Sequence, residues 1–101
     1  MARVTTLQLL EKHAAILALR CPLRRPARLR LVKSKANHGA TYLCRDGFWL
    51  TITRGSRAVM LDTLIHEWAH ARAWGRGKDH GDKWGIEYAR AYRVVIGEDK
   101  A

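Results

Sequence analysis

The chain has 101 residues, of which 48% are hydrophobic and 28% are charged, and its formal net charge is +10. This length allows one domain with a modest core and excludes a second catalytic lobe, while the composition excludes an intrinsically disordered chain. The high charge predicts a polyanionic partner such as a nucleic acid; the alternative is a soluble, self-repelling basic surface. We expect residues 1–101 to form a single domain.

The cysteines and the distribution of apolar residues predict where in the cell the protein is found. Cys21 and Cys44 form no CxxC pair, and the apolar residues from Leu7 to Leu19 are interrupted by polar ones. We therefore expect neither a signal peptide nor a stretch of about 20 apolar residues that would span a bilayer. The sequence predicts a cytoplasmic monomer with reduced thiols and no membrane contact.

The first half of the chain predicts a helix followed by strands. Residues 5–20 place apolar side chains at helical spacing behind a capping box, with His13 as an ordinary surface or boundary histidine. Residues 27–33 alternate apolar with basic side chains, which is typical of a strand with one solvent-facing side. The further expected elements are a loop over 34–39, a short strand over 40–44, a hairpin turn over 45–47 and a strand over 48–53. We expect the strands to pair antiparallel.

The second half predicts two helices. Residues 57–74 contain no glycine or proline, Ser56 is a candidate N-cap, and two glycines just beyond this segment are expected to end the helix. A last helix is expected from Asp82, as its cap, to about Ile96, with Gly97 ending it. The fold class is therefore α+β, with an N-terminal helix, a small antiparallel sheet, a central helix and a C-terminal helix.

The central helix contains an HExxH motif, formed by His66, Glu67 and His70 with two intervening residues. Side chains four residues apart on a helix lie one above the other, with Cβ atoms about 5–6 Å apart. Two imidazoles placed in this way can share one zinc ion. Glu67 is then beside the metal and can take a proton from metal-bound water, which makes it the predicted catalytic base.

A third ligand is expected downstream of the motif. His80 lies in a glycine-flanked loop, and three histidines would leave a fourth position open for water, which is a catalytic rather than a structural arrangement. Glu87 on the last helix is the rival ligand, as in gluzincin-type peptidases, unless it pairs with Arg90 or Arg93. We favour His80 because a glycine follows it directly and a tryptophan follows four positions later, in the pattern HGxxW.

Two segments resemble a known family. Residues 62–71, with the sequence DTLIHEWAHA, and residues 80–84, with the sequence HGDKW, resemble the SprT-like zinc metallopeptidases, which include the Spartan DNA–protein crosslink proteases. The resemblance covers roughly the second half of the chain and extends upstream to the strand over 49–53. The first half matches only in its coarse order of elements.

The resemblance implies a zincin-like metallopeptidase fold with zinc held by His66, His70 and His80, Glu67 as general base, and an association with DNA. It implies a zinc metalloprotease that hydrolyses peptide bonds in proteins near DNA or bound to it. From the small size of the domain we expect an intracellular protein encoded by a bacterium or a phage. The chain differs from several members in a shorter linker between His70 and His80, and it lacks the CxxC pairs of a zinc ribbon.

Several other residues have expected supporting roles. Asp62 and Asp82 are candidates for accepting hydrogen bonds from the ligand histidines. Tyr88 and Tyr92 are candidate donors to an oxyanion, although core or boundary positions are the commoner role of such tyrosines. The strand over 49–53 is expected to offer an edge to a substrate peptide.

The tryptophans are expected mainly in the core, and Trp68 and Trp84 most clearly so. Trp74 lies between two arginines in the sequence and is a candidate for contacting a base. Two alternative functions remain open. One is a basic nucleic-acid-binding protein with a structural zinc, and the other is a zinc hydrolase that acts on a substrate other than a peptide.

Overall fold

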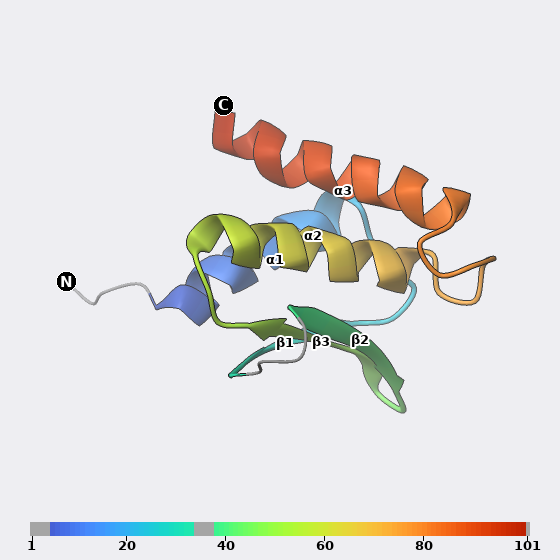
Figure 1. The fold of residues 1–101 in the computed structure, drawn as a ribbon, viewed down its shortest axis with the longest axis horizontal. Coiled ribbons are helices and arrows are strands. Elements are labelled where there is room, and N and C mark those ends of the chain that lie inside the picture. The colour runs from blue at the N-terminus through green and yellow to red at the C-terminus, as the bar shows by residue number, and fades with distance from the viewer. Residues whose placement is uncertain (1–4, 34–37, 101) are drawn as a thin grey trace.

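The computed structural model describes residues 5–33 and 38–100, which form three helices and one three-stranded sheet. The elements in chain order are α1 (Thr6–Arg20), β1 (Ala27–Val32), β2 (Gly39–Cys44), β3 (Gly47–Thr53), α2 (Arg57–Arg72) and α3 (Asp82–Lys100). All helices lie on one side of the sheet, with α1 and α2 next to it and α3 beyond them (Figure 1). The expected α+β class is confirmed. Within the described ranges, no helix has the length and apolar content needed to cross a bilayer.

Local capping sets the starts of the first two helices, as the sequence predicted. The Thr5 hydroxyl accepts a hydrogen bond from the Gln8 backbone N–H at 3.0 Å, and the Gln8 side chain accepts one from the Thr5 N–H at 2.9 Å. The Ser56 hydroxyl accepts from the Val59 N–H at the start of α2. These bonds satisfy backbone donors that have no partner within the helix.

The sheet is mixed, so the expected antiparallel sheet is wrong in one of its two pairings. The strand order is β1-β3-β2, with β2 antiparallel and β1 parallel to β3. The hairpin turn joins β2 to β3 as expected, because Gly47 adopts φ 138°. β3 takes the centre because it is the most buried strand, while β1 has exposed arginines and β2 an exposed tip, which suit edges.

Three further expectations need correction. α2 ends at Arg72 rather than residue 74, before the glycines are reached. α3 continues through Gly97, because one glycine weakens a helix by about 1 kcal/mol and does not by itself end it. His13 is buried, with 5% of its surface exposed, rather than a surface residue. Of the loop expected over residues 34–39, positions 34–37 lie outside the described residues.

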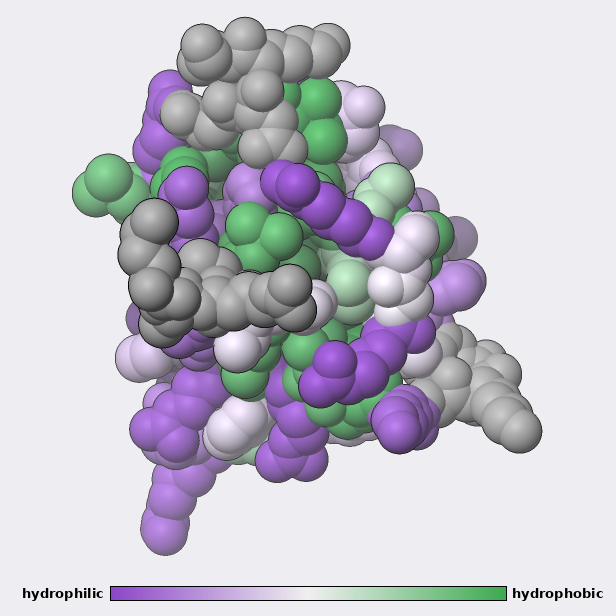
Figure 2. All heavy atoms as spheres, turned by 90° about the vertical axis from the view of Figure 1, so that its left-hand side faces the viewer, coloured by the Kyte–Doolittle hydropathy of each residue, from purple (hydrophilic) through white to green (hydrophobic). Residues whose placement is uncertain are grey.

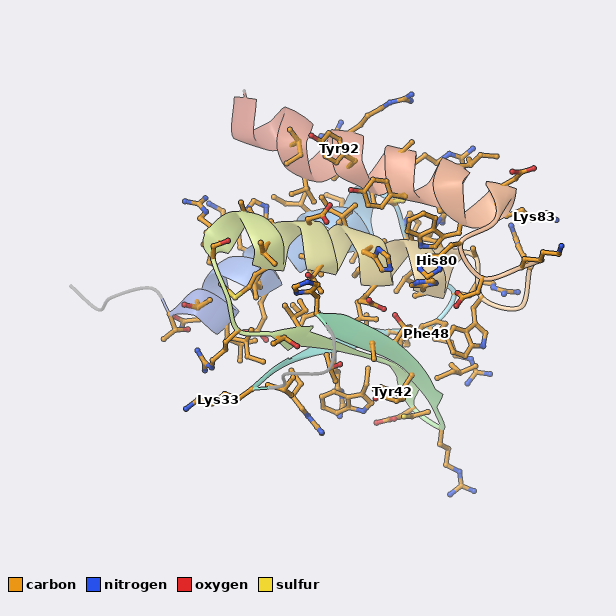
Figure 3. All side chains as sticks on the ribbon, in the orientation of Figure 1. Lys33, Tyr42, Phe48, His80, Lys83 and Tyr92 are labelled. Carbon is orange, nitrogen blue, oxygen red and sulfur yellow. The ribbon has the colours of Figure 1, made fainter. Side chains whose placement is uncertain are left out.

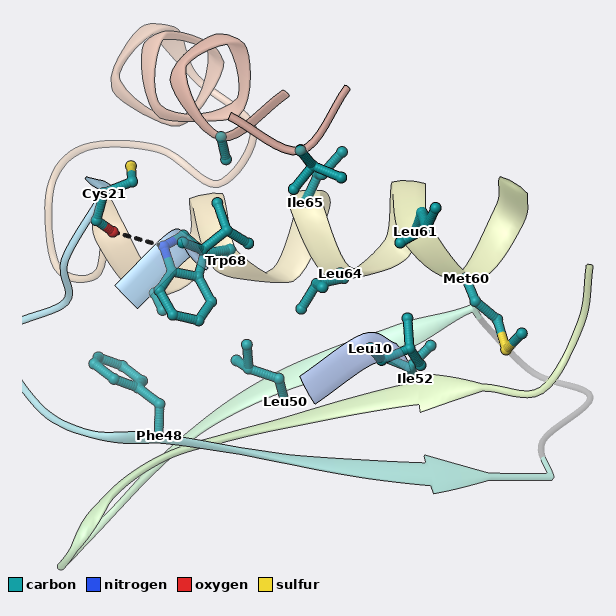
Figure 4. Close-up of a cluster of buried hydrophobic side chains, with 14 residues drawn as sticks. Leu10, Cys21, Phe48, Leu50, Ile52, Met60, Leu61, Leu64, Ile65 and Trp68 are labelled. Carbon is teal, nitrogen blue, oxygen red and sulfur yellow. Dashed lines mark hydrogen bonds between the residues drawn. The ribbon is translucent and has the colours of Figure 1, made fainter. Parts of the chain in front are cut away.

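The hydrophobic core lies between the sheet and the helices (Figure 4). Leu50 and Ile52 of β3 and Leu64 and Trp68 of α2 are essentially fully buried. The Trp68 indole N–H donates to the Cys21 carbonyl at 2.8 Å, which ties the end of α1 to α2. Both cysteines are free, Cys21 buried and Cys44 exposed. Hydrophilic side chains project from the lower, sheet side of the molecule in Figure 2, while hydrophobic ones show between the layers.

Candidate metal centre

The structure brings together the three histidines that the sequence singled out. His66 and His70 project from α2, and His80 lies beside the C-terminal half of this helix, in the loop before α3 (Figure 3). The Nε2 atoms of His66 and His70 are 3.2 Å apart, and the Nε2 atom of His80 is 3.0 Å from each of them. Three ring nitrogens thus form a nearly equilateral triangle.

The backbone at His80 is held in an uncommon conformation that directs its ring toward α2. His80 has φ 56°, and within the described ranges it is the only residue other than glycine with a positive φ. Histidine tolerates the left-handed region better than most residues, but the conformation persists only where its surroundings enforce it. Trp84 supplies part of these surroundings, because its ring centroid lies 4.8 Å from that of His80 and 4.9 Å from that of His66.

Asp79 orients one of the rings. Its Oδ1 atom lies 3.1 Å from the Nδ1 atom of His70, and its Oδ2 atom lies 3.9 Å from the Nδ1 atom of His80. A carboxylate next to Nδ1 favours the tautomer with its proton on Nδ1, which leaves the Nε2 lone pair of His70 free for a metal. Asp79 was not predicted from the sequence, although it directly precedes the candidate ligand His80.

The donor set fits zinc. A tetrahedral site with Zn–N distances of about 2.0–2.1 Å separates its nitrogens by about 3.3 Å, close to the spacing found here. Neutral imidazole nitrogens are good zinc ligands, and three nitrogens directed at one point cannot all satisfy one another by hydrogen bonds. The group found among the described residues contains only these three side chains. Such a set would leave a fourth position for water or substrate.

Glu67 lies beside this triangle. Its side chain is buried, with Oε2 4.0 Å from the Nε2 atom of His66, while Oε1 accepts a hydrogen bond from the Thr41 hydroxyl at 2.7 Å. Burial raises the pKa of the Glu67 carboxyl, and the hydrogen bond from Thr41 lowers it by a smaller amount. A carboxylate with a raised pKa accepts a proton more readily near neutral pH.

Burial acts in the opposite direction on two of the histidines. It lowers the pKa of both His66 and His70, and the neighbouring imidazoles lower these pKa values further. The charged form of an imidazole is disfavoured away from water and next to another cation. Both rings therefore stay neutral to lower pH than a free imidazole, which is the form that binds metal.

The edge strand β2 passes next to Glu67. A Cβ atom at Gly39 would lie 2.6 Å from the Thr63 side chain and from the Thr51 carbonyl, so only glycine allows β2 to approach α2 this closely. Gly39, His66 and Glu67 line two neighbouring cavities, of about 480 and 510 Å³. The triangle and the carboxylate are therefore reachable from solvent along β2.

Glu87, the rival ligand, points elsewhere. Its carboxylate accepts from the Arg72 guanidinium at 2.6 Å and from Arg90 at 3.0 Å, and its side chain is buried. Arg72 also donates to the Pro22 carbonyl, so this network links α2, α3 and the segment after α1. The expected alternative of an ion pair with Arg90 is confirmed, and Arg72 is a further partner.

The remaining candidates lie around the centre with different roles. The Asp62 carboxylate accepts a hydrogen bond from the Tyr88 hydroxyl, whereas the sequence predicted a ligand histidine as its partner. Burial, together with this bond, raises the pKa of Tyr88 to about 12. Tyr92 is 44% exposed, and Asp82 lies in the first turn of α3. Trp84 packs against the histidines rather than in the core, and Trp74 packs edge-on against Phe48.

No protein-family model, curated protein or solved structure matches the chain. The geometry of the centre and the sequence motifs are therefore the basis for inferring a function, and membership of the SprT-like peptidases is a proposal.

Proposed function

We propose that the protein is a zinc-dependent peptidase of the zincin-like, SprT-like type, with His66, His70 and His80 as metal ligands. The observation that carries this proposal is the triangle of ring nitrogens, 3.0–3.2 Å apart, beside a buried carboxylate. A structural zinc site is normally closed by four protein ligands, whereas a three-ligand site keeps one position open. When bound, zinc lowers the pKa of water and polarises a carbonyl group.

The protein side chains supply the proton transfer. Glu67 takes a proton from the attacking water and passes it to the leaving amine, which is the task of a general base that becomes a general acid. Thr41 holds the Oε1 atom of Glu67 at 2.7 Å, so Oε2 remains directed toward the histidines. A fixed carboxylate loses little orientational entropy during the reaction.

The substrate is inferred from the neighbouring strand. The sequence predicted that residues 49–53 would offer the substrate an edge, but β3 is the central strand and is paired on both sides. β2 is an edge strand of the described sheet, and it lies next to Glu67 through Thr41 and Gly39. An extended peptide can add to such an edge through main-chain hydrogen bonds, with little selection by side chain.

A turnover assay tests this proposal. Zinc-loaded protein is incubated with unfolded casein and with an ester substrate, and Glu67→Gln serves as the control because it keeps the shape of the side chain. Cleavage of casein that is lost in Glu67→Gln is the expected result. Ester cleavage without any proteolysis would replace the peptidase by another zinc hydrolase. Absence of both activities in zinc-loaded protein would contradict the catalytic proposal.

A further inference from the structure

The outer face of the sheet carries a second feature. The helices cover one side of the sheet only, and Tyr42 points away from them on the other side (Figures 1 and 3). Along β3, Phe48, Leu50 and Ile52 are buried toward the helices, so the alternate position Trp49 faces outward. The outer face is therefore a solvent-facing surface within the described part of the chain.

Four side chains on this face form what we call the outer-face cluster: Arg28, Arg30, Tyr42 and Trp49. Arg28 of β1 and Tyr42 of β2 are the direct neighbours of Trp49 in the strand register, so the three residues form one row across the sheet. The guanidinium carbons of Arg28 and Arg30 lie 5.6 and 4.9 Å from the centre of the Trp49 ring. Tyr42 is 54% exposed.

The net charge of the protein is concentrated in the same part of the chain. From Arg20 to Arg57 the sequence has eight arginines and two lysines against one acid, Asp46, which gives +9 of the total of +10. Asp46 lies 3.4 Å from Arg28, but both side chains are more than half exposed, so this pair is weak. Arg45 and Lys33 extend the positive charge to opposite ends of the strands, about 20 Å apart.

The geometry points to a binding surface for single-stranded nucleic acid on the outer-face cluster. Unpaired bases stack on aromatic rings and on guanidinium planes, and flanking cations neutralise the phosphates. Some RNA-binding modules use an open sheet face in this way. A duplex keeps its bases stacked within the helix and would use only the charges. The inference gives a location to the association with DNA that the sequence predicted, and it needs neither the metal nor Glu67.

The test measures the fluorescence anisotropy of a labelled oligothymidylate of about 12 nucleotides. The double variant Arg28→Gln with Arg30→Gln is compared with a second double variant, Arg57→Gln with Arg93→Gln. The second one removes the same charge from exposed positions on α2 and α3. We expect the dissociation constant to rise about 10–100-fold in the first variant, against about threefold or less in the second.

A second matched pair isolates stacking from charge. Tyr42→Leu should weaken binding of the oligothymidylate about 5–100-fold, whereas Tyr92→Leu, at a similarly exposed position on α3, should leave it unchanged. Tyr42→Leu should leave duplex binding unchanged.

Equal losses in the two arginine double variants would overturn the proposal in favour of a diffuse charge effect. It would also be overturned if Tyr42→Leu bound the oligothymidylate as well as wild type, or if polyglutamate of equal charge competed as strongly. Zinc content and casein turnover are measured on the variants of the outer-face cluster. Because this cluster lies on the side of the sheet opposite the helices, neither zinc content nor casein turnover should change. Failure here is thus distinguishable from failure of the peptidase proposal.

Discussion

Two buried carboxylates on neighbouring helices of this small protein have opposite surroundings. Glu67 on α2 accepts one hydrogen bond from a neutral hydroxyl and faces three imidazoles and solvent-accessible cavities. Glu87 on α3 is held between the guanidinium groups of Arg72 and Arg90. Their exposed fractions, 5% and 7%, are nearly the same. Burial alone therefore does not distinguish a candidate catalytic carboxylate from a structural one. The charge of the hydrogen-bond partners and the access to solvent do.

The largest expected effect is a difference in casein cleavage between variants of the two glutamates. Glu67→Gln should lower casein cleavage by about 10²–10⁴-fold, because an amide cannot accept the proton. Glu87→Gln should keep cleavage within a few-fold of wild type, since its side chain lies outside the ligand group. Initial rates with zinc-saturated proteins measure both. Equal losses would show that the two carboxylates do not differ in role.

The next effect concerns the aspartate that orients His70. Asp79→Asn should weaken zinc binding about tenfold, at the low end for such partners because the Asp79 side chain is 79% exposed. Competition with a chromophoric chelator measures the affinity. Asp82→Asn, at a nearby position in the first turn of α3, is the matched control and should bind zinc as wild type does. An unchanged affinity in Asp79→Asn would remove Asp79 from the centre.

Stability separates the glutamates in the other direction. Glu87→Gln should lower the free energy of unfolding by about 1–3 kcal/mol, because it weakens charge-assisted hydrogen bonds to Arg72 and Arg90. Urea denaturation of metal-free protein measures this loss. Its zinc content should match that of wild type. A Glu87→Gln variant as stable as wild type would indicate that the arginine network contributes nothing measurable.

The smallest effect is a shift in pH dependence. Thr41→Val removes the hydrogen bond that lowers the pKa of Glu67, so burial raises that pKa further. Glu67 must be deprotonated to act as a base, and the acidic limb of the pH–rate profile should therefore move to higher pH. Thr51→Val, on the neighbouring strand β3, should leave the limb in place. A limb that stays fixed in Thr41→Val would belong to another group.

The local parts of the fold and the centre were predictable from sequence. The capping box, the start of α2 and the proximity of His66 and His70 all depend on residues at most four positions apart. Hydrogen-bond spacing and helical periodicity act over this range, so the pattern carries the information.

The long-range parts were not predictable in the same way. The parallel pairing of β1 with β3, the hydrogen bond from Thr41 to Glu67 and the link from Arg72 to Glu87 join residues 15 or more positions apart. They depend on which strand is buried deepest and on the close approach that Gly39 allows. No local preference encodes such pairings, since several strand orders satisfy the same alternation of residues.

Metal content by elemental analysis tests the central claim most directly. Wild type, His80→Ala and Glu87→Gln are purified without added metal, loaded with zinc, and freed of excess ion by gel filtration. The account predicts about one zinc per chain in wild type and in Glu87→Gln, and loss of zinc in folded His80→Ala. Folded wild type that retains no zinc, or a His80→Ala variant that retains it fully, would contradict the three-histidine centre.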